Sequence, residues 1–183
     1  MDADVFALQK HISTDGYLFA RKDRRAGGFI PNGVLRLPKD SKALSLLADF
    51  VLQKGQIPDW WAETTTQEYL NQHPEVSFET LPLGITGPEA LGHFLELTGE
   101  HEKALKFGVL YPLTARQKKE LLVTPRKIGP SSYPDSLSIH LYATGIRRRL
   151  MRTNGIPPKG SLLDYLCDQT EIDASLNPIT HRD

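Results

Sequence analysis

The sequence predicts an α+β fold, a single helix-rich domain over residues 1–183 with a small N-terminal antiparallel sheet and a helical C-terminal half. Three observations lead to this prediction. Segments 17–21 and 28–37 have strand-like composition and flank a polar, glycine-containing stretch at 22–27. Beyond residue 40, apolar residues recur mainly at helical spacing. A chain of 183 residues with 39% hydrophobic content is long enough to bury one continuous core.

The N-terminal part of the chain is expected to begin with a helix over residues 4–12, before the hairpin made by the two strand-like segments. A helix over residues 41–53 follows, because leucine, valine and phenylalanine residues recur around it. Either Asp40 or Ser41 is available as its N-cap, and Gly55 stands just past its end. This pattern combines a start signal, an apolar face and a stop signal.

The middle of the chain is expected to mix helix and strand. Residues 60–71 form a helix that Asp59 can cap and that a following proline stops. Residues 76–83 alternate enough between apolar and polar to predict a strand. Pro88 suits the first turn of another helix, which carries leucines and a phenylalanine toward the glycine at position 99.

The C-terminal half is expected to be helical. The helices expected there cover residues 104–110, 115–122, 135–153 and 161–167. The loop 124–134, rich in proline, glycine and serine, is the best candidate for an internal boundary within the single domain. The tail 169–183 has too few apolar residues to anchor itself firmly.

Charges are sorted along the sequence, although the formal net charge is zero. Residues 55–102 contain nine acids and neither Lys nor Arg, whereas residues 114–159 contain ten basic residues and only two acids. An excess of this size attracts a polyanion or an acidic protein surface to the basic stretch. By the same argument, the acidic segment 55–102 is a candidate contact for a basic protein partner.

The basic stretch supplies the candidate binding residues, which would contact phosphates or carboxylates. These residues are Lys118, Lys119, Arg126, Lys127, Arg147, Arg148, Arg149 and Arg152. Three of the arginines are consecutive, so at about 100° per residue they fan around a helix and only part of the cluster can face one ligand. The alternatives without a partner are a solvated basic face, a basic face neutralised by the protein's own acidic stretch, and arginines that stabilise a helix C-terminus. We interpret the chain as a non-enzymatic cytosolic protein that binds nucleic acid or a nucleoprotein or protein partner and needs no cofactor.

An enzymatic alternative comes from two short motifs. Residues 21–25 (Arg-Lys-Asp-Arg-Arg) precede Gly33 by eight positions, and residues 100–102 (Glu-His-Glu) precede a Gly-Val-Leu-Tyr turn at 108–111. This pattern resembles the ADP-ribosyltransferases of the cholera- and pertussis-toxin type. The resemblance implies that Arg21 holds the phosphates of NAD, while Glu100 and Glu102 supply the carboxylates that stabilise an oxocarbenium-like sugar.

Other sites have weaker support. His93, Glu96 and Glu100 fall at helical spacing with His101 nearby, but a glycine is expected to end that helix before the set is complete, so no metal site is expected. Cys167 lies among leucines and is expected to be a buried, inert thiol. As the only cysteine it cannot form an internal disulfide. No apolar run reaches the roughly 20 residues of a membrane span, so we expect a cytoplasmic protein without membrane contact.

Overall fold

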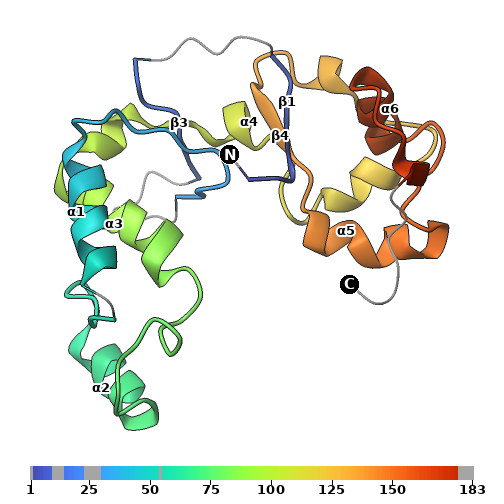
Figure 1. Ribbon diagram of the computed structural model, residues 1–183. Helices are drawn as coiled ribbons and strands as arrows, with labels where there is room; N and C mark the ends of the chain where they lie inside the picture. The colour runs from blue at the N-terminus through green and yellow to red at the C-terminus, as the bar shows by residue number, and fades with distance from the viewer. Residues whose placement is uncertain (1, 10–14, 23–29, 54, 177–183) are drawn as a thin grey trace. The chain divides into compact units, whose positions relative to one another are not determined.

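The computed structural model describes residues 2–9, 15–22, 30–53 and 55–176 (Figure 1). The chain divides into two compact units. Unit 1 comprises Met1–Ser13 and Phe107–Asp183, and unit 2 comprises Thr14–Lys106. Each unit contains its own cluster of buried apolar side chains. The predicted fold class is confirmed, because the described chain is rich in helix and contains one small antiparallel sheet and one separate parallel strand pair.

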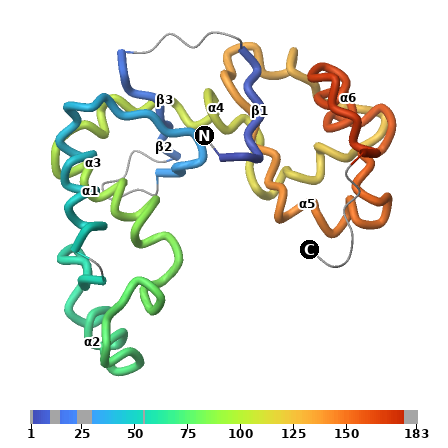
Figure 2. The backbone as a smooth tube through the Cα atoms, in the orientation of Figure 1, coloured from blue at the N-terminus to red at the C-terminus, as the bar shows by residue number. Residues whose placement is uncertain are grey.

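Unit 2 is centred on α1 (Lys42–Leu52) and α3 (Ala90–Leu97), which lie side by side in Figures 1 and 2. Phe50 of α1 and two leucines of α3 belong to its buried cluster. The remaining elements of this unit are β2 (Ala20–Arg21), α2 (Glu63–Gln72), a π-helical turn (Ile85–Glu89), a 3-10 helix (Glu100–Lys103) and β3 (Leu105–Lys106). The short strands β2 and β3 pair in parallel, with Ala20 opposite Leu105.

The helix predicted over residues 41–53 is confirmed as α1. Ser41 is its N-cap, and the Ser41 side chain accepts a hydrogen bond from the backbone N–H of Leu44 at 3.1 Å. This bond satisfies one of the N–H groups that a helix start leaves without a partner. The helix expected after Pro88 is confirmed as α3, and the helix expected over 60–71 begins later, as α2.

Two predictions in unit 2 need correction. Residues 76–83 form turns rather than a strand, because the Thr80 hydroxyl accepts from the N–H of Ser77 and donates to its carbonyl, which occupies backbone groups that a strand would pair. Within the described residues, the two predicted hairpin strands are joined at a single antiparallel bridge between Leu18 and Arg36, and β2 pairs with β3. Residues 23–29, which include most of the predicted crest at 22–27 and the first two residues of the predicted strand 28–37, lie outside the described residues.

Unit 1 contains the small antiparallel sheet, formed by β1 (Val5–Ala7) and β4 (Ser138–His140), which run side by side in Figure 1. Its buried cluster draws on Ile139 of β4 together with helical side chains from α5 and α6. The other elements are α4 (Phe107–Leu110), α5 (Ala143–Leu150), α6 (Leu162–Gln169) and 3-10 helices at Lys118–Leu122, Pro130–Ser132, Met151–Thr153 and Ala174–Leu176.

The helix predicted over residues 4–12 is wrong within the described residues 4–9, because β1 pairs with a strand more than 130 residues away, with Phe6 opposite Ile139. The long helix predicted over 135–153 is also wrong at its start. Hydroxyls of Ser136 and Ser138 donate to the carbonyls of residues 108 and 110, which holds this segment extended. Tyr142 then takes a left-handed conformation with φ of 53°, so the helix begins only after it. Similarly, the helix predicted over 104–110 is split into β3 and α4.

The helix predicted over 161–167 is confirmed as α6, with Ser161 as its N-cap, and the 115–122 helix is reduced to a 3-10 turn from Lys118. The loop 124–134 lies within unit 1, where Ile128 and Tyr133 pack against the buried cluster. The single domain over the whole chain stays a prediction. Within the described ranges, no helix has the length and hydropathy that a membrane crossing demands.

Candidate functional site

The predicted basic helix exists as α5, continued by the 3-10 turn of residues 151–153. Ile146 and Leu150 anchor it, since they are only 3% and 8% exposed and belong to the core of unit 1. Arg148, Arg149 and Arg152 are exposed on the opposite side. At about 100° per residue, these three arginines fall within one arc around Gly145, at positions i+3, i+4 and i+7.

A fourth cation joins this side of α5 from another element. The Lys118 side chain, from the 3-10 helix before the loop, lies directly across Gly145: a Cβ atom at position 145 would be 2.5 Å from Lys118 Nζ and 2.7 Å from Cδ. A side chain at position 145 would therefore displace the flexible end of Lys118 from this place. The four residues Lys118, Arg148, Arg149 and Arg152 are called the basic face below.

The remaining predicted binding residues also belong to unit 1. Arg147 is half-buried and points away from the arc of Arg148 and Arg149, as the consecutive spacing predicts. The Arg126 guanidinium stacks over the Tyr165 ring of α6, with its Cζ 4.2 Å from the ring centroid. Lys119 and Lys127 are exposed. The structure therefore brings together part of the predicted cluster and places the Arg126 guanidinium in contact with α6.

The arginines of the basic face are not neutralised by ion pairs within the described part of unit 1. Arg148, Arg149 and Arg152 form no ion pair there with any described carboxylate, whereas Lys159 is shared between Asp164 and Asp168 at 3.6 and 3.8 Å. The whole of unit 1 has twelve Lys and Arg against nine Asp and Glu, and unit 2 has ten against thirteen. Unit 1 therefore has an excess of basic residues and unit 2 an excess of acidic residues.

The residues of the enzymatic alternative lie in unit 2 and make contacts of other kinds. Glu100 accepts hydrogen bonds from the backbone N–H of Ala43 at 2.9 Å, from the Ser41 hydroxyl at 2.5 Å and from the Tyr17 hydroxyl at 3.0 Å. Its carboxylate therefore sits on the first turn of α1, where a negative charge is favourable. Glu102, in the same 3-10 helix as Glu100, is exposed.

The same hydrogen bonds control the protonation of Glu100. Burial by itself would raise the pKa of this carboxyl, but hydrogen bonds to its charged form from Ser41, from the Ala43 N–H, from Tyr17 and from Thr98 outweigh burial and hold the pKa below its ordinary value. The Tyr17 pKa is raised in turn, first by burial and then by its hydrogen bond to Glu100. This carboxylate is an anionic helix cap.

Arg21, the proposed dinucleotide-binding residue of that alternative, forms an ion pair with Glu96 of α3, at 2.6 Å between Nη2 and Oε1. Only 10% of the Arg21 side chain is exposed. The other oxygen of Glu96 lies 3.4 Å from Nδ1 of His101. His93, which the sequence places at helical spacing from Glu96, stacks on Trp60. The structure therefore gives these two residues different contacts.

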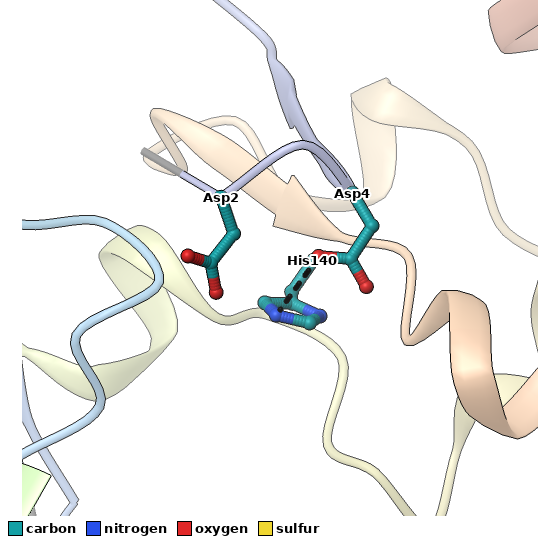
Figure 3. A group of neighbouring side chains, drawn as sticks. All are labelled: Asp2, Asp4 and His140. Atoms are coloured by element: carbon teal, nitrogen blue, oxygen red, sulfur yellow. Dashed lines mark ion pairs between the residues drawn. The ribbon is translucent and has the colours of Figure 1, made fainter. Parts of the chain in front are cut away.

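A different group in unit 1 has the composition of a metal site. Asp2, Asp4 and His140 each offer a ligand atom, and these atoms lie within 4.8 Å of one another. Figure 3 shows both carboxylates beside the imidazole ring, which comes from β4. The ion pair drawn there joins Asp4 Oδ1 and His140 Nε2 at 3.5 Å.

The hydrogen bonds around His140 do not fit a metal ligand. Nδ1 accepts a hydrogen bond from the Tyr142 N–H at 3.0 Å, so in the neutral ring the proton is on Nε2, the atom that faces Asp4. A metal needs the lone pair that this proton occupies. Asp4 is also engaged through Oδ2, which accepts from the Ala143 N–H at the start of α5. The group therefore fits a hydrogen-bonded connection between β1, β4 and α5.

Cys167 of α6 is partly exposed, whereas the sequence predicts a buried thiol. Burial raises its pKa, and the negative charges of Asp164 and Asp168 raise it further. Both effects lower the fraction of the reactive thiolate at neutral pH.

Sequence reasoning missed two features of these sites. The contact between Lys118 and Gly145 cannot be predicted from neighbouring residues in the sequence, because the two residues belong to different elements. The sequence does contain the spacing that places four residues on one side of a helix, i, i+3, i+4 and i+7, at Gly145, Arg148, Arg149 and Arg152. The run of three consecutive arginines makes this spacing hard to recognise. Comparison of the chain with protein-family models, with curated proteins and with solved structures finds no match.

Proposed function

We propose that the protein is a non-enzymatic binding protein whose unit 1 contacts the phosphate backbone of nucleic acid through the basic face. The observation that carries this proposal is the convergence of Lys118 with Arg148, Arg149 and Arg152 on one exposed side of α5, without an ion pair to a described carboxylate. Unpaired guanidinium groups on an anchored helix are ready to bind phosphates, because forming the contact breaks no existing ion pair.

The dimensions of the basic face support a phosphate backbone as its ligand. Positions 145 and 152 are separated by about 10 Å along the helix at about 1.5 Å per residue. Over that distance along its axis, a duplex presents about three phosphates on each strand, at about 3.4 Å per strand, which is enough for four cationic side chains. No base-reading element is part of the proposal, so we expect binding that depends little on nucleotide sequence.

The other predicted basic residues have a supporting role in this proposal. Lys119 and Lys127 are exposed and extend the positive charge of unit 1, while Arg126 is held on Tyr165. We place this activity in the cytoplasm, supported by the single cysteine, Cys167, which no internal disulfide can use.

The experiment is a binding titration with fluorescently labelled nucleic acid, one mixed-sequence duplex and one single strand, followed by anisotropy. The variant Arg148→Gln/Arg149→Gln should lose most of the affinity while remaining folded, because both side chains are exposed. The control Lys39→Gln/Lys106→Gln removes the same charge from exposed positions of unit 2 and should bind like the wild type. Equal loss in both variants would mean that net charge alone drives binding. Absence of binding by the wild type would favour an acidic protein surface as the partner and overturn the proposal.

A further inference from the structure

Unit 2 contains a cavity that combines aromatic walls with carboxylates. It has a volume of about 270 Å³ and is lined by Phe50 of α1, Trp60 and Phe94 of α3. The three rings contact one another, with centroid distances between 5.0 and 6.0 Å. Asp49 and Asp59 also line the cavity, and both are exposed at its edge.

The orientation of Trp60 is set by its surroundings. Its ring stacks on His93 with centroids 4.4 Å apart and an interplanar angle of 22°. Its indole N–H donates to Glu89 at 3.2 Å, and the same carboxylate oxygen accepts from the indole of Trp61. A wall held by stacking and hydrogen bonding loses little freedom when a ligand binds, which favours affinity.

The charges at this cavity select a cation. No Lys or Arg among the described residues lines it, and Asp49 forms no ion pair with any of those residues. The exposed Asp59 carboxylate is 4.0 Å from His93, too far for a strong pair. Aromatic faces attract cations as well, and the guanidinium group combines stacking on a ring with paired hydrogen bonds to a carboxylate.

We propose that this cavity binds the arginine side chain of a basic protein segment, with the guanidinium between the Trp60 wall and the carboxylates of Asp49 and Asp59. The volume is just below the range of about 300–1,000 Å³ that is usual for small-molecule sites, and it suits a single side chain. This inference rests on unit 2 and is independent of the nucleic-acid proposal for unit 1.

The test uses the full chain labelled with ¹⁵N, because its two tryptophans give separate indole N–H resonances in an NMR spectrum. A Trp61→Phe variant assigns the Trp60 resonance. The probe is the peptide N-acetyl-Gly-Arg-Gly-amide, compared with the same peptide carrying citrulline, which has the shape of arginine without the charge. We expect a saturable shift of the Trp60 resonance with the arginine peptide, at a Kd in the range of about 1 mM, and a weaker effect with citrulline.

Two matched variants locate the contact. Asp49→Asn/Asp59→Asn should weaken the arginine peptide about tenfold, whereas Glu63→Gln/Glu68→Gln, which neutralises two exposed acids of α2, should not. The inference is overturned if Trp60 does not respond up to about 50 mM peptide. It is equally overturned if citrulline binds as well as arginine, or if both double variants weaken binding alike. A Trp60 resonance that shifts when the protein alone is diluted would identify a second copy of this chain as the occupant instead.

Discussion

Replacing Glu100 with glutamine should destabilise unit 2 although it changes only one atom. The carboxylate accepts hydrogen bonds from the N–H of Ala43 and from the hydroxyls of Ser41 and Tyr17 at 2.5–3.0 Å. A hydrogen bond to a charged group contributes about 1.5–3 kcal/mol, against about 0.5–1.5 kcal/mol for a neutral one. Glutamine keeps neutral versions of some of these bonds, and solvent access to the site reduces the difference. We expect a loss of about 2 kcal/mol in the free energy of unfolding.

The assay is urea denaturation followed by tryptophan fluorescence, because Trp60 and Trp61 both belong to unit 2. The control is Glu102→Gln, an exposed position two residues along the same 3-10 helix, which should change the free energy of unfolding by less than about 0.5 kcal/mol. Comparison of the two variants also distinguishes a helix cap from a catalytic motif. A Glu-x-Glu active site requires both carboxylates for activity but neither for stability.

The effect of Glu100→Gln should depend on pH. The folded protein holds the pKa of Glu100 below the ordinary value of about 4.3. The stabilisation by this carboxylate is therefore complete above that value and is lost as the pH falls through the lower, folded pKa. The difference between wild type and variant should shrink in acid. A variant as stable as Glu102→Gln at pH 7, or a deficit that persists when the carboxyl is protonated, would refute the helix-cap assignment.

Two further predictions concern unit 1. Asp4→Asn should lower the free energy of unfolding by about 1 kcal/mol, because Asp4 pairs with His140 and caps the N–H of Ala143, and added Zn²⁺ should leave the melting temperature of the wild type unchanged. A rise in melting temperature with Zn²⁺ would instead establish metal binding. Cys167 should react with iodoacetamide more slowly than free cysteine at pH 7.5, because its raised pKa leaves less thiolate, and mass spectrometry of the alkylated protein measures the rate. Alkylation as fast as that of free cysteine would contradict this prediction.

The elements that sequence reasoning predicted correctly have their determinants nearby in the chain. α1 combines an apolar face with an N-cap serine, Ser41, whose side chain accepts a hydrogen bond from the N–H three residues later. α6 has the same arrangement, because the Ser161 side chain accepts from the Asp164 N–H. Such caps depend on residues within one turn, so a single sequence contains the whole signal.

The failures occur where the partner of a segment is distant. Residues 5–7 form a strand because their backbone groups pair with those of residues 138–140. Residues 138–140 are extended in turn because the hydroxyls of Ser136 and Ser138 donate to the carbonyls of residues 108 and 110. Apolar spacing alone predicted helix for both segments. The same holds for the candidate site. Local spacing predicts the arginines of α5, whereas Lys118 lies against Gly145 of the same helix through a tertiary contact.

The salt dependence of nucleic-acid binding tests the central claim most directly. If Lys118, Arg148, Arg149 and Arg152 all neutralise phosphates of a duplex, log Kobs should fall with log salt concentration with a slope of about −3.6, which is about a 150-fold loss between about 50 and 200 mM salt. Arg148→Gln/Arg149→Gln should reduce the steepness by about 1.8. A slope that this double variant leaves unchanged, or a wild type that does not bind at low salt, would contradict the account.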